Sequence, residues 1–391
     1  MSAIERREFL RTGTAAALLP GALISPAINQ PRGSASTQHS NDDQVRMSGD
    51  GLGLNAQQLS RVWMELADEG EILPDSYSNG GSVKILEDEV ARVLGKERAV
   101  FMPTGTLANH LAVRALSAGL GRIVVQHESH LFNDSGDCVQ NLSGLNLIPL
   151  APERSTFTVD ELRDAVERSE SGRVTTPITV ISIESPVRRR YGESFDENEL
   201  VDIVEFARGR QIRLHLDGAR LFLQSAYTGR AVSDYASLFD TVYISLYKYF
   251  NAPSGAILAG PRHLLDEMFH ARRMFGAGLP AAWPFASIAT RYLAGFTERF
   301  KDAILVSESL IKRLQEHDSF QIRRQAAGTN IFTLRMLGQR PRIFLRNLEA
   351  QGINGVRQFR DHPEFLLSVN ETWNRADPDT LAERFVTAWE G

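Results

Sequence analysis

The sequence predicts an α/β protein with a large, mostly parallel sheet and a smaller C-terminal α+β domain. Two observations predict it. Short runs rich in Val and Ile alternate with amphipathic segments between residues 99 and 258, as in parallel strands covered by helices on both faces. From about Pro284, longer helical segments lead to short strands and a last helix near Pro378–Trp389, which indicates the separate small domain.

The elements of the large domain follow from local patterns. A helical pattern over Val83–Leu94 ends at Gly95, because glycine readily adopts the conformation that stops a helix. A strand at Ala99–Met102 precedes Thr104-Gly105-Thr106, which begins a helix that extends to about Ala118. Further strands are expected at Ile123–Gln126, Leu145–Leu150, Ile178–Ile183, Arg213–Leu216, Thr241–Leu246 and Ala256–Leu258. Helices are expected at Val159–Glu167, Glu197–Arg208, Ser233–Phe239 and within Ala286–His317.

The first 27 residues have the features of an export signal. Arg6-Arg7 precedes Phe9-Leu10 and a mild apolar stretch that ends at Ser25-Pro26-Ala27, a pattern that resembles a twin-arginine signal peptide. We therefore expect a periplasmic or secreted protein; an ordinary basic N-terminus would leave it cytoplasmic. Mass spectrometry of the exported protein tests this expectation, and a chain still beginning at Met1 would contradict it.

Composition sets the remaining organisation. We expect an N-terminal arm over residues 28–75, a large domain over 76–283 and a small domain over 284–391. Residues 28–45 are rich in Ser, Gln, Asn and Asp and are expected to be flexible. The net charge of −5 gives no electrostatic footprint for nucleic acid, and no long apolar run after the leader favours membrane association. The single cysteine, Cys138, excludes an internal disulfide and a multi-cysteine metal site.

Lysine is rare in this chain, and one lysine stands apart. Only five of the 43 basic residues are lysines. Lys248 follows an apolar strand and lies among aromatic residues in Tyr247-Lys248-Tyr249-Phe250. A desolvated lysine has a lowered pKa and becomes an amine nucleophile, as Schiff-base chemistry requires. The alternative is a lysine that extends from a strand end to solvent. The other four are in or beside amphipathic helices and are expected to be surface charges: Lys84, Lys96, Lys301 and Lys312.

Polar motifs also follow other predicted strands. Asp217, at the end of one strand, could hold a pyridinium nitrogen protonated, or could cap a helix. Gly105 and Thr106, at the start of a helix, suit a phosphate group.

His130 follows a third strand and could stack on an aromatic ring. His127 and His130 lack an evident third partner for a metal, so no metal is expected. Because the carboxyl ends of parallel strands meet at one edge, these residues and Lys248 indicate a pyridoxal 5′-phosphate (PLP) site there.

The motifs resemble those of the threonine aldolase and β-eliminating lyase family, which are PLP-dependent enzymes of fold type I (aspartate aminotransferase-like). The resemblance covers about Val45 to Ser287 and extends more weakly into the C-terminal domain. It is carried by Pro103-Thr104-Gly105-Thr106, Ser129-His130, Leu216-Asp217-Gly218-Ala219-Arg220, Ser245-Leu246-Tyr247-Lys248 and Arg272-Arg273-Met274-Phe275-Gly276.

The resemblance implies a role for each of these residues. Lys248 would form the internal aldimine and then act as a general base, and Asp217 would pair with the pyridine nitrogen. His130, the second catalytic candidate, would stack on the ring. The phosphate would bind to Gly105 and Thr106. A homodimer or homotetramer is implied, because the sites of this family form at a subunit interface. Arg273 would reach the phosphate of a neighbouring subunit.

The substrate side of the site matches the family less well. Arg220 would bind the substrate carboxylate, unless it is purely structural, and Ser48 is a weaker match for the same task. Threonine aldolases have Glu-Asn-Thr-His after the strand that ends here at Ile183, and its histidine contacts the substrate hydroxyl. This chain has Glu184-Ser185-Pro186-Val187 instead.

We therefore expect a PLP-dependent lyase that acts on a small amino acid substrate. The expected reactions are aldol-type cleavage of a β-hydroxy-amino acid such as threonine, or β-elimination. The alternatives are an aminotransferase or racemase on the same fold, or a non-catalytic homologue that binds the cofactor.

Overall fold

The computed structural model describes residues 43–337, 341–358 and 364–391. The expected signal peptide and most of the segment 28–45 lie outside these residues. Within them, no helix combines the length and the hydropathy that crossing a membrane requires.

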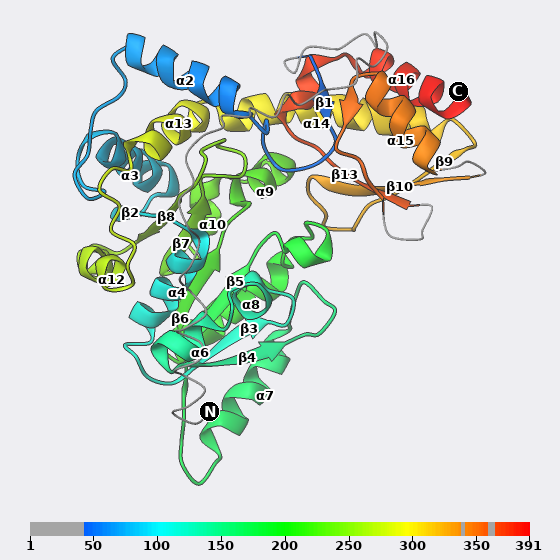
Figure 1. The fold of residues 1–391 in the computed structure, drawn as a ribbon. Coiled ribbons are helices and arrows are strands. Elements are labelled where there is room, and N and C mark those ends of the chain that lie inside the picture. Colours follow the sequence, from blue (N-terminus) through cyan, green and yellow to red (C-terminus); the bar gives the residue numbers. More distant parts are fainter. Residues whose placement is uncertain (1–42, 338–340, 359–363) are drawn as a thin grey trace, which may run out of the picture. The chain divides into compact units, whose positions relative to one another are not determined.

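A seven-stranded sheet forms the centre of the large domain, in the order β2-β8-β7-β6-β5-β3-β4 (Figure 1). Its strands are β2 (Arg98–Met102), β3 (Arg122–Gln126), β4 (Asn146–Leu150), β5 (Ile178–Glu184), β6 (Arg213–Asp217), β7 (Thr241–Ser245) and β8 (Ala256–Gly260). Strand β8 is antiparallel to both of its neighbours, while the pairs from β7 to β4 are all parallel. The predicted mostly parallel sheet is therefore confirmed.

Helices cover both faces of this sheet, as the burial of β8 shows. Ile257 and Ala259 pack into one apolar cluster, and Ala256 and Leu258, which alternate with them, pack into another. The helices are α3 (Gly81–Leu94), α4 (Gly105–Leu116), α5 (His130–Asn133), α6 (Cys138–Ser143), α7 (Val159–Glu170), α8 (Glu197–Gly209), α9 (Leu221–Thr228), α10 (Val232–Ala236), α11 (Arg262–Leu265) and α12 (Met268–Met274).

Local capping sets where α3 ends and where α4 begins. Gly95 ends α3 with a φ of 65°, as predicted. The Thr104 side chain caps α4 by accepting a hydrogen bond from the Leu107 amide at 3.2 Å. The helix expected at Ser233–Phe239 is the shorter α10, which ends at Ala236.

The C-terminal part of the chain has the predicted α+β character. A four-stranded antiparallel sheet has the order β12-β13-β10-β9. Its strands are β9 (Phe320–Arg323), β10 (Ile331–Met336), β12 (Arg357–Gln358) and β13 (Glu364–Ser368). The accompanying helices are α13 (Trp283–Leu293), α14 (Phe296–Gln315), α15 (Pro341–Ala350) and α16 (Pro378–Glu390). Gly295, with a φ of 65°, separates α13 from α14.

The N-terminal segment joins this C-terminal part. Strand β1 (Val45–Arg46) pairs in parallel with β11 (Ile353–Asn354), and Figure 1 shows it beside the orange and red elements. Val45 is fully buried, so the prediction of flexibility is wrong at the end of the segment 28–45. The chain then continues to α2 (Ala56–Asp68), a helix that sequence patterns did not predict.

One residue of this segment, Gly51, lies directly against the loop that carries Lys248. A Cβ atom on Gly51 would come within 2.3 Å of the Lys248 carbonyl oxygen. Only glycine therefore permits this close approach.

Candidate active site

A cavity of about 540 Å³ opens at the carboxyl ends of the parallel strands. Four of the residues predicted for the site line it: His130, Asp217, Arg220 and Lys248. They lie at the end of β6 or within a few residues after β3, β6 and β7, which is where open α/β sheets bind ligands. The size suits a small organic molecule.

Lys248 is half-buried in this cavity, rather than extended into solvent. Its Nζ atom lies 3.4 Å from the Tyr247 hydroxyl oxygen and 6.0 Å from the centre of the Tyr243 ring. Burial and the Arg220 guanidinium lower the pKa of Lys248. The amine is therefore easier to deprotonate than a surface lysine, as a nucleophile requires.

Among the other lysines, Lys96 departs from the prediction. It is half-buried, and its Nζ atom donates a hydrogen bond to the Phe239 carbonyl oxygen at 2.6 Å. Burial lowers the pKa of Lys96. It lies outside the cavity, so Lys248 is the lysine of the site.

Asp217 is held by a chain of buried hydrogen bonds. Asn109 donates from Nδ2 to Asp217 Oδ2 at 2.6 Å, and Asn109 Oδ1 lies 2.9 Å from His215 Nε2. The amide oxygen can only accept, so His215 donates from Nε2, and its Nδ1 accepts from the Thr241 hydroxyl at 2.9 Å. Burial lowers the pKa of His215 to about 4, which matches this neutral form. The chain fixes the direction in which the Asp217 carboxylate points.

Arg220 already has a partner that sequence patterns did not identify. Its Nε and Nη2 atoms each lie 2.9 Å from Asp50 Oδ2, and both side chains are almost completely buried. Although burial by itself raises the pKa of Asp50, Arg220, Lys248 and Asn330 together outweigh it and hold the pKa below its usual value. Asn330 also donates to Asp50, at 3.1 Å. Asp50 therefore neutralises the positive charge of Arg220 at the cavity wall.

Glu184 is a second residue that sequence patterns did not single out for the site. It ends β5, lines the cavity and is buried. Its two carboxylate oxygens accept hydrogen bonds from the backbone amides of His130, at 2.6 Å, and of Arg188, at 3.0 Å. Burial and the nearby Asp217 carboxylate raise the pKa of Glu184 to about 7. Its position at the same strand edge as Asp217 was the signal that could have identified it.

The raised pKa of Glu184 predicts a dependence of stability on pH. Because the folded-state pKa of about 7 lies above the ordinary 4.5, folding favours the protonated acid. The stabilising contribution is thus complete below pH 4.5 and is lost as the pH rises through 7. Thermal melts from pH 4 to 9 should show a Glu184→Gln variant losing less stability over this range than the parent.

A matched control for this experiment is Glu205→Gln, a change at an exposed position of α8. This variant should follow the parent at every pH. Parallel curves for the parent and Glu184→Gln would contradict the prediction.

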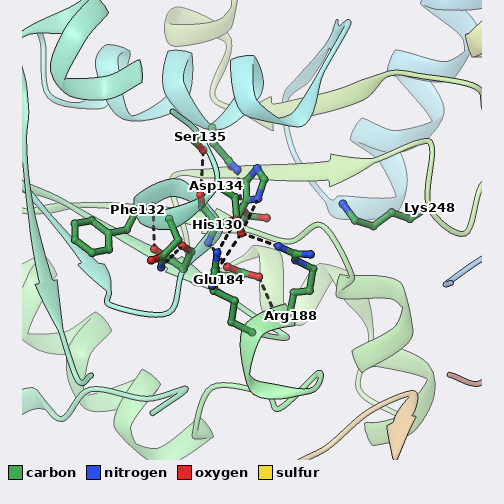
Figure 2. Close-up of polar contacts among 12 residues, drawn as sticks. His130, Phe132, Asp134, Ser135, Glu184, Arg188 and Lys248 are labelled. Carbon is green, nitrogen blue, oxygen red and sulfur yellow. Dashed lines mark hydrogen bonds and ion pairs between the residues drawn. The ribbon is translucent and has the colours of Figure 1, made fainter. Parts of the chain in front are cut away.

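His130 begins α5 beside a carboxylate. Ser129 caps this helix, with its hydroxyl accepting from the Phe132 amide at 3.4 Å. His130 Nδ1 lies 3.6 Å from Asp134 Oδ2, within the same turn. Figure 2 shows His130 and Asp134 on one side of the site and Lys248 on the other.

Four predicted residues do not line the cavity: Ser48, Gly105, Thr106 and Arg273. Gly105 nevertheless lies directly behind the cavity wall. A Cβ atom there would come within 2.0 Å of the hydroxyl oxygen of Tyr243, which does line the cavity, so only glycine lets α4 begin here.

Ser48 and Arg273 lie in two different places outside the cavity lining. Ser48 lies against Gly355, where a Cβ atom would come within 2.5 Å of the serine Oγ. The Arg273 guanidinium lies 4.8 Å from the centre of the Tyr77 ring.

Comparison with known proteins gives a consistent result. The family model described as "Beta-eliminating lyase" matches residues 66–336. The low-specificity L-threonine aldolase of Saccharomyces cerevisiae is 28% identical over 65% of this chain and 65% of its own length. An alanine racemase, TOXG, of Cochliobolus carbonum is 31% identical over 49% of each chain. This chain thus covers less than two thirds of the length of either relative.

Two solved structures resemble the whole fold. A protein from Exiguobacterium sp. 255-15, titled a putative aromatic amino acid beta-eliminating lyase/threonine aldolase, is 26% identical with a TM-score of 0.75, and the match covers 90% of this chain and 98% of that one. A structure titled SPT with PLP internal aldimine is 14% identical with a TM-score of 0.66, and the match covers 99% and 96%. The fold is that of the PLP-dependent enzymes of fold type I, and the chain belongs to the beta-eliminating lyase family.

Proposed function

We propose that this protein is a PLP-dependent lyase that cleaves the Cα–Cβ bond of β-hydroxy-α-amino acids such as threonine. The observation that carries the proposal is the placement of Lys248 and Asp217 in one cavity, in a chain of the beta-eliminating lyase family. The family, the threonine aldolase among its relatives and the fold support the same reaction class.

The residues of the cavity fit PLP. A lysine amine with a lowered pKa and a firmly oriented carboxylate are the two groups that the cofactor requires of the protein. Outside the cavity lining, directly behind Tyr243, the start of α4 has a helix N-terminus with backbone amides of the kind that bind phosphate. We infer that Lys248 holds the cofactor covalently, Asp217 its ring nitrogen, and Gly105 and Thr106 its phosphate.

The chemistry can then be divided between cofactor and protein. When bound, PLP supplies an electron sink for a bond broken at Cα. Asp217 keeps a proton on the ring nitrogen, and the freed Lys248 amine moves protons to and from Cα. Val187, which is fully buried, stands where the family has its hydroxyl-contacting histidine. We assign the removal of the hydroxyl proton to His130, which lines the cavity beside Asp134.

We further propose that the active protein is a homodimer or homotetramer. Arg273 lies outside the cavity of its own chain, on α12, where its guanidinium packs on Tyr77. In an oligomer, the Arg273 guanidinium would bind the cofactor phosphate of the neighbouring subunit. Light scattering of the purified protein measures this state directly.

The function is tested by offering purified holoprotein a panel of β-substituted amino acids. We expect threonine or allo-threonine to give glycine and acetaldehyde in equal amounts. Ammonia and a 2-oxo acid in place of glycine and aldehyde would instead establish β-elimination. Absence of all these products would contradict lyase activity.

A second candidate function is amino acid racemisation, which the likeness to the fungal alanine racemase favours. It uses the same cavity residues, because Lys248 would remove and return a proton at Cα. Incubating alanine in deuterated water distinguishes the two functions. A racemase gives D-alanine labelled at Cα, whereas the proposed lyase gives no net inversion.

A further inference from the structure

Arg188 lines the cavity but has no task in the proposed mechanism. It follows directly after Glu184-Ser185-Pro186-Val187, the segment in which this chain departs from the threonine aldolase pattern. The position that would contact the substrate hydroxyl is now an apolar, buried side chain, and a guanidinium stands next to it.

Arg188 shares its carboxylate partner with a second arginine. Asp134 Oδ2 accepts from Arg188 Nη2 at 2.8 Å, and Asp134 Oδ1 accepts from Arg189 Nη2 at 2.6 Å. Although burial by itself raises the pKa of Asp134, the two arginines lower it to about 2, so this carboxylate is ionised. Asp134 therefore faces two guanidinium groups, and the Glu128 and Glu184 carboxyl groups also lie close enough to act on Arg189. Across the cavity, Asp50 is paired with Arg220, and burial raises the pKa of the adjacent Glu184 to about 7.

The backbone holds Arg188 firmly in place. Its amide donates to Glu184 Oε1 at 3.0 Å, so the arginine is tied to the end of β5 and to the residue that also holds His130. The side chain is half exposed, toward the cavity that it lines. Figure 2 shows it reaching the Asp134 carboxylate on the side of the site that faces Lys248. Its remaining donors are available to a molecule in the cavity.

We propose that the preferred substrates carry a second carboxylate, on Cβ, and that Arg188 binds it. The proposal rests on the proposed lyase function and names its substrate class, the β-hydroxy-α-amino dicarboxylic acids. A guanidinium matches a planar carboxylate with two parallel hydrogen bonds, whereas a hydroxyl or methyl group would leave it unmatched.

The reaction of the simplest such substrate, 3-hydroxyaspartate, balances without a further reactant. The β-hydroxyl loses its proton, the Cα–Cβ bond breaks with its electron pair going to Cα, and Cα takes up a proton. The products are glycine and glyoxylate, whose carboxylate is the group that Arg188 binds.

The test compares 3-hydroxyaspartate with threonine in the parent, Arg188→Gln and Arg188→Lys. We expect the parent to prefer the dicarboxylate in kcat/KM. Arg188→Gln should lower the ratio of the two kcat/KM values by about 10-fold to 100-fold, as expected for a lost charge-assisted hydrogen bond, with KM for 3-hydroxyaspartate carrying the change. Arg188→Lys should recover part of the ratio, because lysine keeps the positive charge but lacks the two parallel N–H donors of a guanidinium.

The matched control is Arg189→Gln. Arg189 contacts the same Asp134 carboxylate but does not line the cavity. Its substitution should leave the ratio within about twofold of the parent. An equal loss of preference in both variants would show that only the Asp134 contact matters, and would overturn the proposal.

A binding measurement separates this proposal from the proposed function. Aspartate and 2-aminobutyrate have no β-hydroxyl, and calorimetry of the holoprotein gives their dissociation constants. Aspartate should bind about tenfold tighter, and Arg188→Gln should remove that difference. One result is that threonine is cleaved, while the enzyme neither prefers 3-hydroxyaspartate in kcat/KM nor binds aspartate more tightly than 2-aminobutyrate. In that case the proposed substrate class is wrong and the lyase function stands. If no amino acid is cleaved but the tighter binding of aspartate still depends on Arg188, the lyase function is wrong and the carboxylate site stands.

Discussion

Lys248→Ala is expected to reduce turnover by about 10³-fold or more, because it removes both the nucleophilic amine and the group that moves protons at Cα. The cofactor should also lose its covalent link to the protein. Two measurements check this result: kcat on the best substrate of the panel, and the visible absorbance that the linked cofactor gives the purified protein. Both should fall together, because both depend on the same Nζ atom in the cavity.

Lys301→Ala is the control for that experiment. Lys301 is exposed on α14 and lies outside the cavity, so its removal tests whether losing any lysine matters. It should keep the activity and the absorbance of the parent. A Lys248→Ala protein that keeps both would refute the assignment of the site.

Asp217→Asn is expected to lower kcat by about 10²-fold to 10³-fold, the usual cost of removing a fixed charge that stabilises the transition state. The amide keeps the shape of the side chain but cannot balance a protonated ring nitrogen. KM should change much less than kcat, since Asp217 is assigned no contact with the substrate. Steady-state kinetics with saturating cofactor measure both constants.

Asn109→Ala offers a graded comparison with Asp217→Asn. It removes the 2.6 Å hydrogen bond to Asp217 while leaving the carboxylate in place. We expect a loss of about tenfold in kcat, because the carboxylate is no longer held in one direction. Circular dichroism confirms that each variant is folded. An Asp217→Asn enzyme with kcat within twofold of the parent would show that the carboxylate has no role at the ring nitrogen.

The sequence was most informative where chemistry depends on neighbours along the chain. Strand ends carry Asp217 and Lys248, and parallel strands bring their carboxyl ends to one edge, so the sequence alone placed these residues together. Gly95 and Thr104 set helix ends through their own backbone and side chain, and both were predicted correctly.

The remaining parts of the site depend on distant segments. Asp50 meets Arg220 across 170 positions of the chain, so no local pattern signals the pair. The contacts of Glu184 with His130 and of Arg188 with Asp134 form only because β3 and β5 pair in the sheet. The local sequence around Glu184 and Arg188 does not show that pairing. Short helices such as α5, with four residues, are too brief for a hydrophobic period and were not predicted.

The pairing of β1 with β11 has a consequence for biosynthesis. Val45 pairs with Ile353, near the other end of the chain. Asp50, the partner of Arg220, follows Val45 by only five positions. A ribosome must therefore have made nearly the whole polypeptide before the wall of the cavity can close. Long-range pairing of this kind slows folding, because a large loop must first be closed. We expect cofactor capture to follow release of the finished chain, so truncated nascent chains should emerge with their cavities incomplete.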